Sequence, residues 1–354
     1  MEEKKEIDMW WTEFKRSDVN KKIELVIDIC NLKKDKKFYE DFEIFDAIND
    51  IKGKLTENQE SKKYLELLEE IKQDYPSCFN ASVSWFIRDL IYGYSESNPE
   101  KIMDLIKYLI DNPDDNPDLI GELVDFLIIK GFLDGAKELL KFYYPFLKKM
   151  GSTIPLGLYE LANILSFFVI AEHSQCKTEE ALNSIKKDLS DLDIKLMDKL
   201  LVKKLAIILN KDYQYTKWKH VNLKNEKNFY TLTFEFTIYL WKNKFNLVLA
   251  QFFQDCVLDY FLESKNSIFK FDKKEVEECI ASWCGFISLR KTRAFAILYS
   301  LFLFYQFLFK MELIKELEYK IIKLDLEELK NKLFSAFEYE GEKYKYLDLL
   351  IEDN

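Results

Sequence analysis

The chain contains 354 residues, 48% of them hydrophobic, and its 62 acidic residues outnumber the 52 basic ones, which gives a net charge of −10. A chain of this length exceeds one ordinary hydrophobic core, so we expect two packed domains or one elongated array. Nucleic-acid binders present a basic face rich in arginine, whereas this acidic chain has arginine only at Arg16, Arg88, Arg290 and Arg293. The composition therefore argues against nucleic acid as a partner.

Glycine and proline are distributed unevenly along the chain. All six prolines lie at or before Pro155, and beyond Gly157 the only glycines are Gly285 and Gly341. Long stretches without these residues propagate helices, because nothing removes a backbone donor or relaxes φ. The sequence therefore predicts an all-α fold. It also lacks a glycine-rich loop that could cradle a phosphate, so no cofactor is predicted.

Residues 1–75 alternate charged and apolar side chains at helical spacing, as at Ile23, Val26 and Cys30. This pattern predicts N-terminal amphipathic helices, each with one buried face. The opening residues are acidic where a secretory signal would be basic, and no apolar run of sufficient length follows. The sequence therefore predicts a cytoplasmic protein.

Residues 76–210 are predicted to form an array of helical hairpins. Asn-Pro-acid trios at 98–100 and 116–118 each place a side-chain acceptor before a helix, a ring at its first position and an acid in its first turn. At 130–136 the connection between two helices is a few residues long, which permits only an antiparallel hairpin.

Residues 117–149 carry a repeat-like pattern of apolar first-helix positions, a turn glycine, and small and large second-helix positions. The matching residues are Leu123, Leu127, Gly131, Leu133, Ala136 and Leu140. The pattern resembles one tetratricopeptide repeat, and it departs from that family at Ile120, Val124 and Tyr143. The resemblance implies a right-handed stack of helical hairpins, an α-solenoid. We expect this stack to be irregular, because the spacing of the helix starts is not constant.

The polar stretch 211–228 is interpreted as a linker, and residues 229–354 as a C-terminal, aromatic-rich helical bundle continuous with the array. Within the bundle, residues 230–240 alternate apolar and polar side chains with the period of a strand. Leu232 and Phe236 also fit a helical stripe, and a lone strand would have no partner. A helix is therefore favoured over a strand.

The segment 294–309 contains no charged residue. As a helix it would span about 24 Å, less than the hydrocarbon core of about 30 Å, and Ser300 and Gln306 interrupt it. A helix that is apolar on all sides is typical of the centre of a bundle. We therefore expect a buried core helix and do not favour a membrane span.

Residues typical of catalytic and metal sites are sparse. The histidines are His173 and His220, and His173 with Cys176 would supply only two of the three or four ligands that a zinc site needs. The six cysteines have no CxxC spacing and are interpreted as buried small hydrophobic residues without a redox role. The sequence therefore assigns no catalytic or metal-binding residue, and an enzyme is not favoured.

Arg290, Lys291 and Arg293 form a local basic cluster at the start of the most apolar predicted helix. Helix N-termini favour anions, so the cluster is a candidate docking site for an acidic peptide or a phosphate. The alternative interpretation is a solvated cap or a set of internal salt bridges in this acidic chain.

Stacked helical hairpins create an extended concave face, and such faces hold other proteins. We therefore expect a non-enzymatic scaffold or adaptor whose partner is a protein or a peptide. Two alternatives stay open. One is an enzyme or effector whose site is assembled from distant helices, and the other is an acidic inhibitor or immunity-type protein that masks a basic partner.

Overall fold

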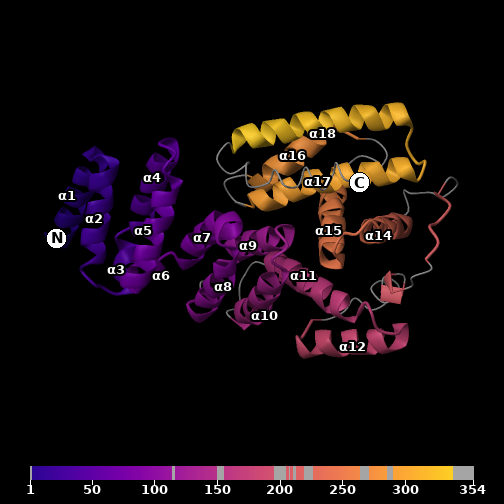
Figure 1. Cartoon of the computed structure of the whole chain (residues 1–354), viewed down its shortest axis with the longest axis horizontal. Coiled ribbons are helices and arrows are strands. Elements are labelled where there is room, and N and C mark those ends of the chain that lie inside the picture. The colour runs from indigo at the N-terminus through magenta and orange to yellow at the C-terminus, as the bar shows by residue number, and fades with distance from the viewer. Residues whose placement is uncertain are drawn as a thin grey trace. The chain divides into compact units, whose positions relative to one another are not determined.

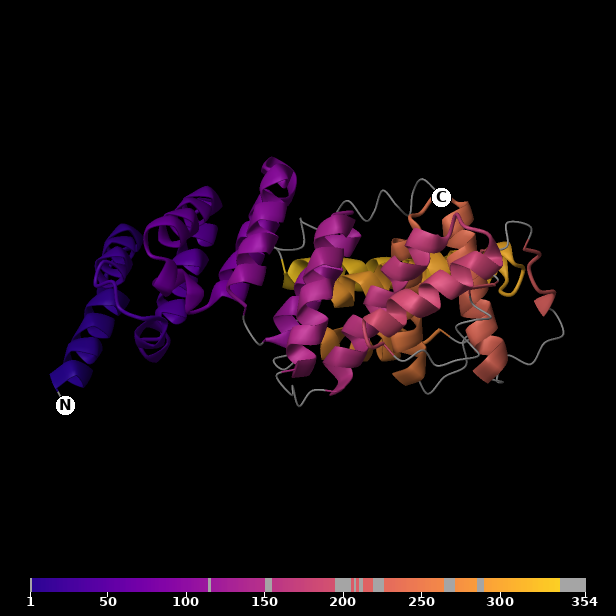
Figure 2. The same cartoon turned by 90° about the horizontal axis from the view of Figure 1, so that it is seen from below.

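The computed structural model describes residues 2–113, 116–149, 155–194, 205–206, 208–209, 213–218, 226–263, 271–284 and 290–337. These residues include 17 α-helices and one short 3-10 helix, and the described part of the chain contains no strand (Figures 1 and 2). The predicted all-α fold is confirmed.

The chain divides into two compact units, Met1–Leu119 (unit 1) and Ile120–Asn354 (unit 2). Within unit 1, neighbouring helices pack on one another, such as α2 on α4, α4 on α5 and α7 on α8. The helices of unit 1 are α1 (Glu2–Arg16), α2 (Val19–Cys30), α3 (Lys36–Asp41), α4 (Ile44–Glu57), α5 (Ser61–Asp74), α6 (Pro76–Asn80), α7 (Val83–Ser97), the 3-10 helix η1 (Pro99–Lys101) and α8 (Ile102–Asp111).

Several helices of unit 1 bury one apolar face, as α2, α4 and α5 do. On α2 the predicted stripe is buried at Val26 and Cys30. Asp18 caps this helix by accepting a hydrogen bond from the Lys21 amide at 3.0 Å. Capping fixes where the helix begins, and burial of one stripe fixes which face turns inward.

The two Asn-Pro-acid trios behave differently. Asn116 accepts a hydrogen bond from the Leu119 amide at 3.1 Å, which confirms the predicted cap of α9 (Pro117–Ile129). Asn98 makes no such bond, and the 3-10 turn η1 precedes α8 instead. A trio of this type therefore marks the start of a helical segment without determining its first hydrogen bonds.

Unit 2 begins within α9. Its remaining helices are α10 (Leu133–Lys149), α11 (Pro155–His173), α12 (Thr178–Asp191), α14 (Glu226–Lys242), α15 (Leu247–Glu263), α16 (Lys273–Cys284), α17 (Lys291–Lys310) and α18 (Glu316–Ala336). The helices α15, α16 and α18 pack on α17 (Figure 1). Gly131 ends α9 in the left-handed conformation at φ 80°, which a residue without a Cβ adopts without strain.

Helix α17 is the core of unit 2. Among the described residues it is the one helix long and apolar enough to cross a membrane, and 89% of its apolar window is buried inside the protein. Phe304 is fully buried against the rings of Phe236 and Phe261, at centroid distances of 5.3 and 5.6 Å. The prediction that residues 294–309 form a buried helix is confirmed.

Residues 230–240 lie within α14, so the helical prediction for this segment is confirmed. The buried carboxylate of Glu235 on α14 accepts hydrogen bonds from the Tyr213 hydroxyl, the Thr216 amide at 2.8 Å and the Trp218 indole at 2.6 Å. Residues 213–218 are thereby held on α14. Each Glu235 oxygen finds a donor, which makes burial of this carboxylate tolerable.

The cysteines are buried as expected at Cys30, Cys78, Cys256 and Cys279. The expectation is wrong for Cys176, which is exposed after the end of α11, and Cys284 is only half-buried.

Candidate functional site

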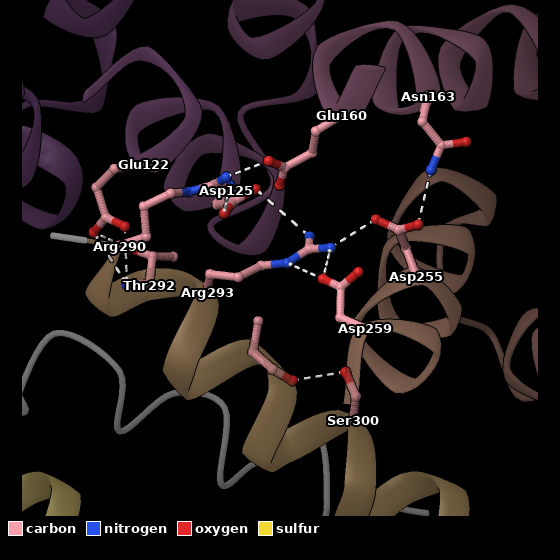
Figure 3. A network of polar contacts seen from close by, with 11 residues as sticks. Glu122, Asp125, Glu160, Asn163, Asp255, Asp259, Arg290, Thr292, Arg293 and Ser300 are labelled. Carbon is pink, nitrogen blue, oxygen red and sulfur yellow. Dashed lines mark hydrogen bonds and ion pairs between the residues drawn. The ribbon is translucent and has the colours of Figure 1, made fainter. Parts of the chain in front are cut away.

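A network of buried and partly buried charged residues joins four helices of unit 2 (Figure 3). The contributing residues are Glu122 and Asp125 on α9, Glu160 and Asn163 on α11, Asp255 and Asp259 on α15, and Arg290, Thr292 and Arg293 at the start of α17. We call this set the arginine–carboxylate network.

Arg290 joins α17 to α9 and α11. Its guanidinium donates through Nη2 to Asp125 and through Nη1 to Glu160, and its side chain is 5% exposed. Its backbone amide donates to the Trp283 carbonyl at 3.1 Å. Charge-assisted hydrogen bonds to two carboxylates offset part of the cost of burying this cation.

Arg293 lies one helical turn further into the core and joins α17 to α15. Its Nε and Nη2 donate to Asp259 at 3.0 and 2.6 Å, and Nη2 also donates to Asp255 at 2.6 Å. Its Nη1 lies 3.8 Å from Asp125 Oδ1, so Asp125 faces both arginines. The Arg293 guanidinium stands 4.9 Å from the ring centroid of Phe252, within the range of a cation–π contact.

Glu122 caps α17 from a different helix. Its carboxylate accepts the Thr292 amide at 3.1 Å and the Thr292 hydroxyl at 2.5 Å. An anion at a helix N-terminus satisfies unpaired amides and interacts favourably with the helix dipole. The anion that α17 requires at its start is therefore supplied by the protein itself.

The network holds more carboxyl groups than guanidinium groups, and burial is the largest influence on the shifted pKa values of its carboxyl groups. Burial raises the pKa of Asp125 to about 7, despite its contacts with Arg290 and Arg293. Burial likewise raises the pKa of Asp259 to about 6, against the opposing effect of Arg293. At Glu160 burial is outweighed by Arg290 and Arg293, so its pKa is lowered. The network thus contains carboxyl groups that exchange protons near neutral pH.

The sequence-predicted cluster is divided by the structure. Arg290 and Arg293 point into unit 2 and pair with its carboxylates. This arrangement matches the alternative interpretation of the cluster as a set of internal salt bridges. Lys291 is half-buried, and its ammonium lies 4.6 Å from the ring centroid of Phe337. An external anion would reach the two guanidinium groups only if the helices of unit 2 separated.

The carboxylates of the network were not singled out from the sequence. Glu160 is the only charged residue in the apolar segment 155–171, and Asp255 and Asp259 are spaced to share one helical face. A lone acid on an apolar face indicates a buried partner. This sequence pattern identifies the acidic residues but does not indicate which basic residue each one pairs with.

Metal chemistry finds no support in the described residues, among which no group of three or more His, Cys, Asp and Glu side chains could hold a metal ion. His173 instead places Nε2 2.7 Å from Asp188 Oδ2 on α12. His220 lies outside the described residues.

Comparison with family models, curated proteins and solved structures finds no match to this chain.

Proposed function

We propose that the protein is a non-enzymatic helical scaffold that binds another protein or a peptide. The observation that carries this proposal is a stripe of exposed apolar side chains on α18, formed by Leu317, Ile321 and Leu324, whose exposed fractions are 71%, 53% and 66%. Spacings of four and three residues place all three on one face of the helix. We call this surface the α18 stripe.

The opposite face of α18 attaches the helix to unit 2. That face consists of the buried residues Ile322, Leu326, Leu329 and Leu333. The α18 stripe is therefore not required to hold the helix in place. Scattered apolar residues are normal on protein surfaces, but a continuous exposed apolar face is typical of a protein contact surface.

Charged residues border the α18 stripe. Lys320 pairs with Glu316 at 2.7 Å and Lys323 with Glu327 at 3.9 Å, so both signs of charge are present. Exposed pairs of this kind contribute little binding energy, and the apolar side chains would supply most of it. The surface suits a partner helix that presents apolar residues at the same spacing.

The finer form of the proposal is a stack of helical hairpins, an α-solenoid, whose concave face contributes to binding. Support comes from the tetratricopeptide-like pattern at 117–149 and from the packing of α10 on α11 and α11 on α12. Consecutive helices that contact their chain neighbours are what such a stack requires. A cytoplasmic location, expected from the sequence, belongs to the same proposal.

A photoreactive residue in place of Leu324 tests the proposal in cells of the native host. We expect it to form covalent adducts with one or a few proteins, which mass spectrometry identifies. The matched control carries the same group in place of Lys274, an exposed residue of α16 whose side chain is 83% accessible. A purified partner should then lose affinity for the Ile321→Glu variant. Equal adducts from both positions, or unchanged affinity of the Ile321→Glu variant, would contradict the proposal.

A further inference from the structure

Two cysteines of unit 1 face each other in its core. Cys30 ends α2 and Cys78 lies in α6, and their sulfur atoms are 2.7 Å apart although the residues are 48 positions apart in the chain. Neither side chain is exposed to solvent. The bond length of a disulfide is about 2.05 Å, so joining the two sulfurs requires a closure of only about 0.7 Å.

The backbone around the two sulfurs is fixed by other contacts. The Tyr39 hydroxyl donates to the Cys30 carbonyl at 3.0 Å and accepts from the Lys34 amide at 3.2 Å, which anchors the end of α2. Helix α6 packs on α3 and α5. The backbone segments that bear the two thiols are therefore held in place by contacts that do not involve the sulfurs.

We propose that Cys30 and Cys78 are a reversible oxidation site that forms a disulfide when the protein meets a hydroperoxide. One thiol reduces the peroxide O–O bond and becomes a sulfenic acid, with release of one water molecule when the oxidant is hydrogen peroxide. The second thiol then attacks that sulfur, the S–O bond breaks, and a second water leaves. In total two thiols lose two electrons and two protons to the peroxide, which is reduced to two water molecules.

Burial of the two thiols slows their reaction with peroxide. The hydrogen bond between the thiols and the burial of Cys78 raise the pKa of Cys78, so this thiol stays protonated in the closed unit and reacts poorly with peroxide. Oxidation therefore proceeds through local opening of unit 1, and reclosure brings the oxidised sulfur against its partner. Cys176, which is exposed, is the internal reference for a thiol without this protection.

The disulfide would connect α2 to α6 and close a loop that contains α3, α4 and α5. Cross-links that close long loops restrict the unfolded chain and stabilise the folded state. The expected result is a rise of about 10 °C in the thermal midpoint of unit 1, reversed by dithiothreitol. Transient disulfides of this kind are compatible with a reducing compartment.

Peptide mapping of the full-length protein tests the proposal. The protein is treated with hydrogen peroxide, quenched, alkylated in denaturant and digested with trypsin without reduction. We expect a cross-link between peptides 23–33 and 73–88, each of which contains one cysteine, and its loss after dithiothreitol. The Cys176→Ser variant should give the same cross-link, and Cys78→Ala should lose both the cross-link and the thermal shift.

Two outcomes would overturn the proposal. One is complete alkylation of Cys30 and Cys78 after peroxide treatment that has oxidised Cys176. The other is pairing of either cysteine with a different thiol. Both are read from the wild-type protein, so the test stands even if the Cys78→Ala variant does not fold.

Discussion

Gly121 lies against the guanidinium of Arg290: a Cβ at position 121 would stand 3.0 Å from Arg290 Cζ, closer than an ordinary van der Waals contact. The missing side chain lets the arginine pass close to the α9 backbone and reach Asp125 and Glu160. Glycine inside a helix costs about 1 kcal/mol relative to alanine. The close approach of Arg290 explains why this helix nevertheless contains a glycine.

We expect Gly121→Ala to destabilise unit 2 by about 2 kcal/mol, because Arg290 is held by two carboxylates and cannot move away without loosening both ion pairs. The matched control is Gly53→Ala on α4, where a Cβ would meet nothing within 4 Å. That variant should gain about 1 kcal/mol from helix propensity. Hydrogen exchange of the α17 and α4 amides measures both effects, and stabilisation at both sites would contradict the prediction.

Sequence reasoning succeeded where local patterns decide the structure. The apolar segment 294–309 predicts the buried α17, and Asn116 predicts the start of α9, because each depends on residues within one or two helical turns. The sequence of residues 230–240 is ambiguous, because its alternation of apolar and polar side chains also fits a strand. Burial of both faces of α14 produces this pattern without a sheet, as the buried Thr233 and Thr237 show.

The arginine–carboxylate network could not be predicted to the same degree. Arg290 and Asp125 are 165 positions apart, and no local spacing relates them. The sequence shows that a basic cluster begins an apolar helix in an acidic chain, which is compatible with an external anion and with internal carboxylates. Only the packing of α9, α11 and α15 around the start of α17 determines which anions the arginines contact.

The double variant Arg290→Gln, Arg293→Gln distinguishes a structural role from anion docking. Because the two substitutions leave the buried Asp125 and the partly buried Asp259 without their cationic partners, we expect unit 2 to lose at least about 3 kcal/mol or to unfold. Lys291→Gln is the comparison and should lose no more than about 1 kcal/mol, the size of the cation–π contact between Lys291 and Phe337. Urea denaturation measures both. A folded double variant of unchanged stability that loses an anionic partner at low salt would favour docking.

The stability of unit 2 should depend on pH in a defined direction. The pKa of Asp125 is raised to about 7 and that of Asp259 to about 6, chiefly by burial, whereas an unfolded aspartate has a pKa of about 3.9. At a pH between the unfolded pKa and the folded pKa, the folded protein keeps these two carboxyl groups protonated, whereas the unfolded chain has released both protons. The contribution of Asp125 and Asp259 to the free energy of unfolding is therefore lost as pH rises through about 6 to 7.

We expect hydrogen exchange of the α17 amides to report weaker protection, after correction for intrinsic exchange rates, at about pH 8 than at about pH 5.5. The Asp125→Asn variant carries a neutral amide in place of the protonated acid, so its dependence on pH should be shallower. Protection that increases with pH in the wild-type protein, or an unchanged slope in the variant, would show that the network is fully ionised in the folded state.

Some helix ends of unit 2 adopt the left-handed conformation without a glycine. Lys244 follows α14 in the left-handed conformation at φ 72°, and the adjacent Phe245 amide donates to the Leu240 carbonyl at 3.1 Å, the pattern of a helix terminus that usually contains glycine. A residue with a Cβ pays about 1 kcal/mol for this conformation. We therefore expect Lys244→Gly to stabilise unit 2 by up to about 1 kcal/mol, although glycine also loosens the unfolded chain. Lys323→Gly, at an exposed position inside α18, should lose about 1 kcal/mol in the same urea titration. If both variants are destabilised equally, the left-handed conformation at Lys244 carries no strain.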